Sequence, residues 1–143
     1  MMVSWVFVNK VSVTTSLSAF WIVKCLSNGN SGKIIFNESV NSIQPGGMTN
    51  LSGGYQKGYT LAKENKSENN ISRVMLLTDG LANEGITDPD QLASIALKMN
   101  HQGITTSTIG VGEDYDEFLL GKMAENGGGG TYYIEKNLKE NDG

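Results

Sequence analysis

The second half of the chain alternates short apolar runs with amphipathic stretches, which predicts strands that alternate with helices. One apolar run covers 72–78 and ends at Asp79-Gly80, and another covers 104–111. Between them, over 90–102, apolar residues recur at the i, i+3, i+4 and i+7 spacing of one helical face. These residues are Leu92, Ile95, Ala96 and Met99. We therefore expect a strand, a helix and a second strand in this order.

Signals for the ends of helices support this reading. Asp88-Pro89 supplies a cap and a proline at the first helical position, and Gly103 ends that helix. Asp114–Glu117 opens another capped helix, which closes at Asn126-Gly127. Two helices of ordinary length are thus predicted between residue 88 and residue 127.

The last strand is predicted to follow a glycine-rich turn. Gly127–Gly130 form this turn, and the strand covers 131–134. Because side chains alternate between the two faces of a strand, one of Tyr132 and Tyr133 is expected to face inward and the other outward. The polar tail over 137–143 is expected to fray.

The first half of the chain shows the same alternation. β-branched and aromatic residues predict a strand over 5–8, and a one-sided apolar spacing predicts a helix over 16–27. A short strand is expected over 33–36 and a helix over 51–64. Strands that alternate with helices favour βαβ units, and hence an α/β fold with a mostly parallel sheet covered by helices on both faces.

Length, charge and cysteine content narrow the class of protein. At 143 residues the chain is expected to form one domain, and the single Cys25 excludes an internal disulfide. A net charge of −4 without a basic stripe argues against binding to nucleic acid. Lys10 and Lys24 interrupt the apolar N-terminal stretch, so we expect neither a signal peptide nor a membrane span, and the compartment stays open. Four Asn-x-Ser triplets, one of them at Asn50, match the glycosylation pattern but are expected by chance.

Four short segments follow one another in an informative order. They are Gly46-Gly47-Met48-Thr49-Asn50-Leu51, LLTDGLAN at 76–83, TIGVGEDYDE at 108–117 and GGGGTYYIE at 127–135. Together they resemble the von Willebrand factor type A domain, in particular its bacterial members, over about 33–136 and most closely over 43–135. The resemblance implies a Rossmann-like, mostly parallel sheet with helices on both faces, with residues 1–143 as a single domain.

The resemblance also implies a ligand site, because this family carries a metal-ion-dependent adhesion site at the C-terminal edge of the strands. Its first loop holds Asp-x-Ser-x-Ser, its second a threonine and its third an aspartate, and the ion is Mg²⁺ or Mn²⁺. By position, Ser12 and Thr14 match the hydroxyls of the first loop, Thr49 matches the second loop and Asp79 the third. These four residues are the implied metal ligands, and an open coordination position would accept a carboxylate from a partner protein of unknown identity.

The first loop departs from the family pattern, because Lys10 stands where the aspartate belongs and no aspartate occurs before Asp79. At about 4 Å and an effective dielectric constant of about 20, one pair of unit charges interacts by about 4 kcal/mol, and a divalent ion roughly doubles the repulsion. Two interpretations of Lys10 stay open: it occupies the position of the ion and neutralises Asp79, or it points to solvent. The chain is also shorter than the family after 33–36, so the antiparallel edge strand is expected to be missing.

Simpler roles and other functions stay open beside this site. Thr49 can serve as a helix N-cap, and Asp79 can belong to an Asp-Gly turn. A hydrolase or nucleotide-binding enzyme on the same sheet is disfavoured, because His101 is the single histidine and falls at a helix end. A non-functional truncated remnant is the other alternative. We favour a protein-binding, adhesion-type module that is not an enzyme and whose divalent-ion site is impaired by Lys10.

Overall fold

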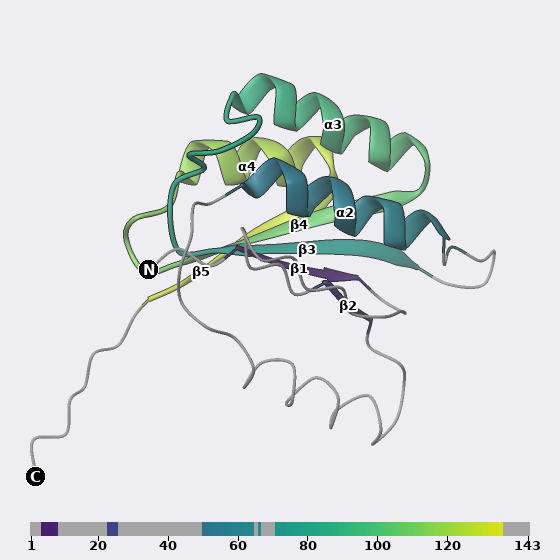
Figure 1. Ribbon diagram of the computed structural model, residues 1–143, viewed down its shortest axis with the longest axis horizontal. Coiled ribbons are helices and arrows are strands. Elements are labelled where there is room, and N and C mark those ends of the chain that lie inside the picture. Colours follow the sequence, from purple (N-terminus) through teal and green to yellow (C-terminus); the bar gives the residue numbers. More distant parts are fainter. Residues whose placement is uncertain (1–3, 9–22, 26–49, 65, 67–70, 136–143) are drawn as a thin grey trace, which may run out of the picture.

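A computed structural model describes residues 4–8, 23–25, 50–64, 66 and 71–135. These residues form an α/β structure with one sheet and a layer of helices (Figure 1). In chain order the described elements are β1 (Ser4–Val8), β2 (Val23–Cys25), α2 (Leu51–Glu64), β3 (Ser72–Thr78), α3 (Pro89–His101), β4 (Ile104–Val111), α4 (Glu117–Asn126) and β5 (Gly128–Ile134).

The five described strands lie in the order β2-β1-β3-β4-β5. β3, β4 and β5 are mutually parallel, and β2 is parallel to β1. β1 runs antiparallel to β3, with Ser4 opposite Thr78 and Val8 opposite Val74. The prediction of an α/β fold with a mostly parallel sheet is therefore confirmed, with one antiparallel pairing inside the sheet.

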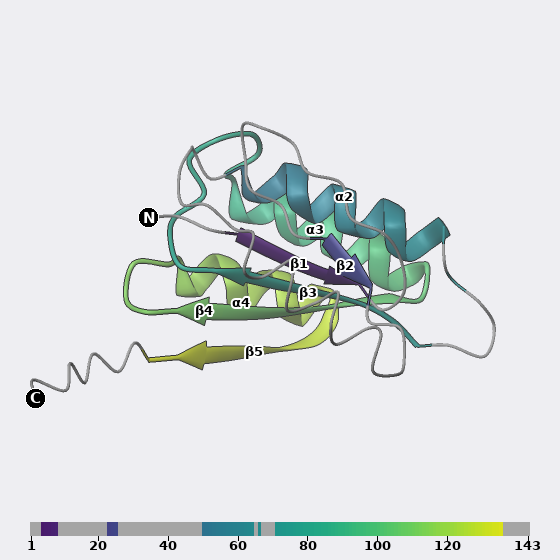
Figure 2. The ribbon, with the colours of Figure 1, turned by 60° about the horizontal axis from the view of Figure 1, so that its bottom comes forward.

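The three described helices lie on the same side of the sheet (Figures 1 and 2). The crossovers from β3 to β4 and from β4 to β5 move in the same direction along the sheet, and right-handed crossovers of that kind place their helices on one face. Whether helices also cover the second face, as expected, depends on residues outside the described ranges.

The elements from α2 to α4 agree closely with the sequence predictions. α2, β3 and β4 have the expected bounds. The backbone N–H of Gln91 donates to the Asp88 carboxylate at 2.8 Å and caps α3, and that of Leu119 donates to Asp116 at 2.9 Å and caps α4. Local capping signals therefore placed both helix starts correctly.

The helix expected over 16–27 is wrong at 23–25, which form β2 in parallel pairing with β1. A short apolar run fits a buried strand as well as a helix, and periodicity alone does not separate the two. The rest of that stretch and the strand expected over 33–36 lie outside the described residues.

The glycine-rich turn predicted before the last strand is also wrong, because β5 already begins at Gly128. A Cβ atom on Gly129 would lie 1.9 Å from the carbonyl oxygen of Thr106 on β4. Glycine is needed here so that the two strands can approach closely. A run of glycines is typical both of a turn and of such a close approach, so the sequence alone does not separate the two.

Tyr132 and Tyr133 do not divide between inside and outside as predicted, since 55% and 47% of their surfaces are exposed. β5 is the last strand in the order of the described sheet, so both of its faces are poorly covered at this end. The alternation rule assumes a strand with one buried face, and an outer strand does not meet that condition.

The hydrophobic core lies between the sheet and the three helices. Its buried side chains come from all of these elements, and Tyr55 of α2 is fully buried among them. The Tyr55 hydroxyl and the Thr106 hydroxyl of β4 are 2.5 Å apart, which satisfies both polar groups inside the core. Burial raises the pKa of the Tyr55 phenol far above its ordinary value, so it stays neutral.

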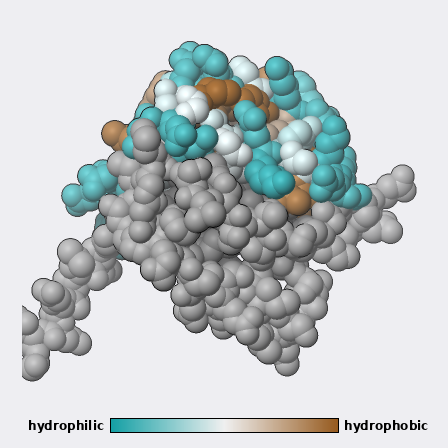
Figure 3. All heavy atoms as spheres, in the orientation of Figure 1, coloured by the Kyte–Doolittle hydropathy of each residue, from teal (hydrophilic) through white to brown (hydrophobic). Residues whose placement is uncertain are grey.

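The outer surface of the helix layer is mainly hydrophilic, with hydrophobic side chains in small groups (Figure 3). In the part of the chain described here, no helix has the length and apolar character needed to cross a bilayer.

Replacement of Gly129 by alanine is expected to lower the free energy of unfolding by about 1–3 kcal/mol, because the new methyl group would overlap β4. Gly121 is the matched control: it lies within α4, and a Cβ there meets no atom within 4 Å. Gly121→Ala should instead raise the stability by about 0.5–1 kcal/mol through helix propensity. Urea unfolding measures both changes, and equal effects at the two positions would contradict the close approach of β5 to β4.

Candidate functional site

Asp79 follows the last residue of β3 and is half-buried at the C-terminal edge of the sheet. The turn after β3 is closed by the preceding Thr78, whose hydroxyl donates to the Gly80 carbonyl at 3.1 Å and accepts from the Gly80 N–H at 3.4 Å. Thr78 therefore helps to hold this turn. The carboxylate lies at the edge where open parallel sheets bind ligands.

The N-terminus of α2 is capped by Asn50. Its side-chain oxygen accepts the backbone N–H of Gly53 at 2.7 Å and the hydroxyl of Ser52 at 3.1 Å. This is the bond of an N-cap residue to the third residue of a helix. The cap proposed as the simpler role of Thr49 is therefore supplied by its neighbour.

The loop that follows Asp79 packs directly on this helix start. The backbone N–H of Ile86 donates to the Ser52 hydroxyl at 2.8 Å, and the two residues are 34 positions apart in the chain. Gly85 has a φ of +72°, and a Cβ there would lie 2.4 Å from Ser52 Oγ and 2.6 Å from Asn50 Oδ1. Only glycine satisfies both this backbone conformation and this contact. The residue that follows Thr49 is thereby held against the loop that follows Asp79.

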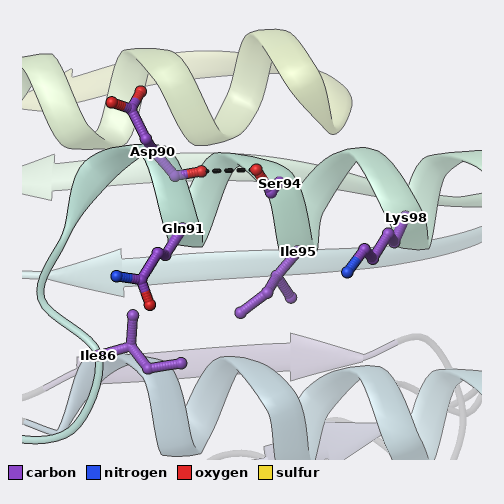
Figure 4. A pocket seen from close by; sticks show the side chains of 6 residues that line it. All are labelled: Ile86, Asp90, Gln91, Ser94, Ile95 and Lys98. Carbon is purple, nitrogen blue, oxygen red and sulfur yellow. Dashed lines mark hydrogen bonds between the residues drawn. The ribbon is translucent and has the colours of Figure 1, made fainter.

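A shallow groove of about 340 Å³ continues from this contact along α3. Its lining residues are Ile86, Asp90, Gln91, Ser94, Ile95 and Lys98. Figure 4 shows Ile86 facing Gln91 and Ile95, while the Asp90 carboxylate points to the other side of α3. There Asp90 forms an ion pair with Lys122 of α4. The groove thus combines an apolar floor with polar residues on its sides.

Of the predicted metal ligands, the structure describes Asp79. Ser12, Thr14 and Thr49 lie outside the described residues, as does Lys10. Val8 is the nearest described residue before Ser12, and it ends β1 opposite Val74, at the edge of the sheet away from Asp79. Within the described ranges, no three His, Cys, Asp or Glu side chains come together in a way that could hold a metal ion.

Sequence reasoning did not find the contact made by Ser52 with Ile86. The triplet that starts at Asn50 was interpreted as a chance glycosylation pattern. In the structure Asn50 caps α2, and Ser52 holds the loop at 85–86. An asparagine immediately before a helical pattern is a capping signal, so Asn50 could have been recognised. The partner of Ser52 could not, because it depends on the path of the loop.

The matching family model is that of the von Willebrand factor type A domain, and it covers residues 21–142. This chain belongs to the von Willebrand factor type A family. The match begins earlier than the resemblance found at 33–136 and includes most of the chain. The family fold expected from the sequence is confirmed, whereas a degenerate ion site stays a prediction.

A curated relative of this type A domain is a much longer protein. An uncharacterized protein of Escherichia coli strain K12, YfbK, is 34% identical over 110 residues, which are 76% of this chain and 19% of that protein. The chain thus spans about a fifth of the length of this relative.

Solved structures confirm the fold. The ArnB paralog VWA2 from Sulfolobus acidocaldarius is 28% identical with a TM-score of 0.50, over 66% of this chain and 24% of that one. Proximal thread matrix protein 1 from the mussel byssus, in a structure with a zinc-occupied MIDAS motif, is 20% identical with a TM-score of 0.55. It matches 82% of this chain and 32% of its own, and at this identity it shows the fold alone.

Replacement of Ser52 by alanine is expected to lower the free energy of unfolding by about 1–2 kcal/mol, because the Ile86 N–H loses its partner. Ser94 is the matched control: it is exposed, and its hydroxyl donates to a carbonyl of its own helix. Ser94→Ala should change stability by less than about 0.5 kcal/mol. Denaturant unfolding of both variants checks this, and a loss that is no larger for Ser52→Ala would refute the bridging role of Ser52.

Proposed function

We propose that this type A domain is a protein-binding, adhesion-type module that binds a partner at the C-terminal edge of its sheet. The observation that carries the proposal is the contact of the α2 start with the loop after β3, through Ser52 and Ile86. This contact brings together the two segments that flank Thr49 and Asp79, the second-loop and third-loop positions of the family site.

The two helix starts nearest to Asp79 favour an acidic group of a partner. α2 begins next to Asp79, because Ser52 in its first turn contacts Ile86 of the loop after β3, and α3 begins where that loop ends. Helix N-termini carry a partial positive charge that attracts anions. A carboxylate of a partner protein is therefore the proposed ligand, with or without an ion.

The proposed ion site for Mg²⁺ or Mn²⁺ is impaired. Lys10 places a positive charge where the family has an aspartate, and like charge opposes a divalent cation.

A role as an enzyme is not proposed. His101 is exposed in the last turn of α3, where a positive charge complements the helix dipole. It lies at the end of α3 that is far from Asp79, because α3 starts after the Asp79 loop and runs back to the start of β4. No histidine is thus placed to act as a base at the proposed site.

Calorimetric titration with Mg²⁺ and with Mn²⁺ tests the impaired ion site. We expect Lys10→Asp to bind either ion at least about tenfold more tightly than the unmodified chain, because ligand charge sets the affinity of such sites. Lys98→Asp makes the same charge change on the exposed surface of α3 and should leave binding unchanged. Tight binding by the unmodified chain would contradict the proposal.

Site-specific photo-crosslinking in cells that express the protein tests partner binding. Leu81 is exposed in the loop after Asp79, and a benzoylphenylalanine in its place should form a covalent adduct with the partner protein. The adduct should be lost when Asp79→Asn is added. Glu125 is the control position, since it is exposed near the end of α4, at the opposite edge. Equal adducts from both positions, or an adduct that is insensitive to Asp79→Asn, would refute binding at this edge.

A further inference from the structure

The outer edge of β5 is a second surface suited to a partner. β5 has seven residues and ends the strand order of the described sheet, where it pairs with β4 (Figure 2). The side of a terminal strand that faces away from its neighbour presents backbone N–H and C=O groups that another extended chain can pair with.

The C-terminal half of β5 exposes large apolar side chains. Tyr132, Tyr133 and Ile134 are about half exposed, and Phe118 at the start of α4 is 67% exposed. The Tyr133 ring is stacked on Tyr115, with centroids 5.7 Å apart and planes 17° apart. Aromatic rings held in place in this way lose little freedom when a partner binds.

This aromatic surface has acidic surroundings. Glu113, Asp114 and Glu117 precede or begin α4, and Glu135 follows β5. Burial, and then the nearby Glu117 carboxylate, raise the pKa of the Tyr133 phenol. From residue 104 to residue 135 the sequence has one basic residue, Lys122, which is paired with Asp90 of α3 and lies over the Phe118 ring, 5.1 Å from its centroid. Within this stretch the acidic side chains therefore outnumber the basic ones.

These features select the chemistry of the partner. Carboxylates beside exposed aromatic rings attract Lys and Arg side chains by charge and by cation–π contact. A second copy paired through β5 would instead place Glu117 and Glu135 against the same acids. We propose that the β5 edge binds an extended, Lys- or Arg-bearing segment of a partner protein, which adds a strand to the sheet.

This inference rests on the proposed function, because it treats the chain as a protein-binding module. It adds the chemistry of one segment of the partner. The register places Thr78, Gly110 and Tyr133 side by side across the sheet, so the end of β5 lies at the same edge as Asp79. One partner could contact both surfaces, but neither surface needs the other in order to bind.

Fluorescence anisotropy with synthetic peptides tests the inference. The probe is a fluorescein-labelled peptide in which lysine and valine alternate. It has about eight residues, which lies within the usual range of strand lengths. Matched peptides carry glutamate in place of lysine, or N-methyl groups on alternate backbone amides. We expect each change to weaken binding by about tenfold or more, because each removes the charge or the backbone pairing. Binding of the lysine peptide should also weaken at high salt.

Variants locate the binding surface. The double variant Glu117→Gln/Glu135→Gln should bind the lysine peptide about fivefold more weakly. Glu125→Gln is the control at the far end of α4 and should not change binding. Absence of binding, equal binding of the glutamate or N-methylated peptide, or an equal effect of Glu125→Gln would overturn the inference. So would a dimer of the chain that excludes the peptide.

The same measurements separate this inference from the proposed function. Asp79→Asn is expected to leave affinity for the lysine peptide unchanged, because the peptide pairs along β5. If no peptide binds while the crosslink at position 81 still depends on Asp79, the β5 inference fails and the proposed function stands. If the peptide binds at β5 and the crosslink fails, the reverse holds.

Discussion

The buried contact of the Tyr55 and Thr106 hydroxyls is the constraint on which the rest of the structure depends. A buried hydroxyl without a partner costs about 1–3 kcal/mol, so Tyr55 can enter the core only where Thr106 meets it. The contact fixes α2 along the middle of the sheet. Thr106 also donates its backbone N–H to the Gly127 carbonyl at 2.9 Å, which ties the end of α4 to the same strand.

With α2 fixed, its first turn can act as a support for the loop after β3. Ser52 accepts the Ile86 N–H, and Gly85 allows the loop to approach within contact of Asn50. The edge that carries Asp79 is thus held in shape by the contacts of Asn50, Ser52 and Gly85. Such supporting contacts hold a recognition surface in one geometry and lower the entropy lost on binding.

The predictions that failed all depended on how the strands pair and where they lie in the sheet. The helix over 16–27 and the turn at Gly127–Gly130 were read from short segments whose local pattern fits two structures, and pairing with neighbouring strands decided between them. The even split of Tyr132 and Tyr133 assumed a covered strand, whereas β5 is outermost in the described sheet. The antiparallel direction of β1 could not be read locally, because the pattern of a strand does not depend on its direction.

The sequence alone determined the helices and strands from α2 to α4, the caps at Asp88 and Asp116, the position of Asp79 at the end of a buried strand, and the family. These features depend on residues within about four positions of each other, or on motif order along the chain. Only the tertiary structure decided that Ser52 meets Ile86, that Gly129 lies against β4 and that β5 ends the described sheet with exposed aromatic side chains. The physical reason is that these contacts join distant segments, so they follow from the path of the chain and the packing of α2 on the sheet.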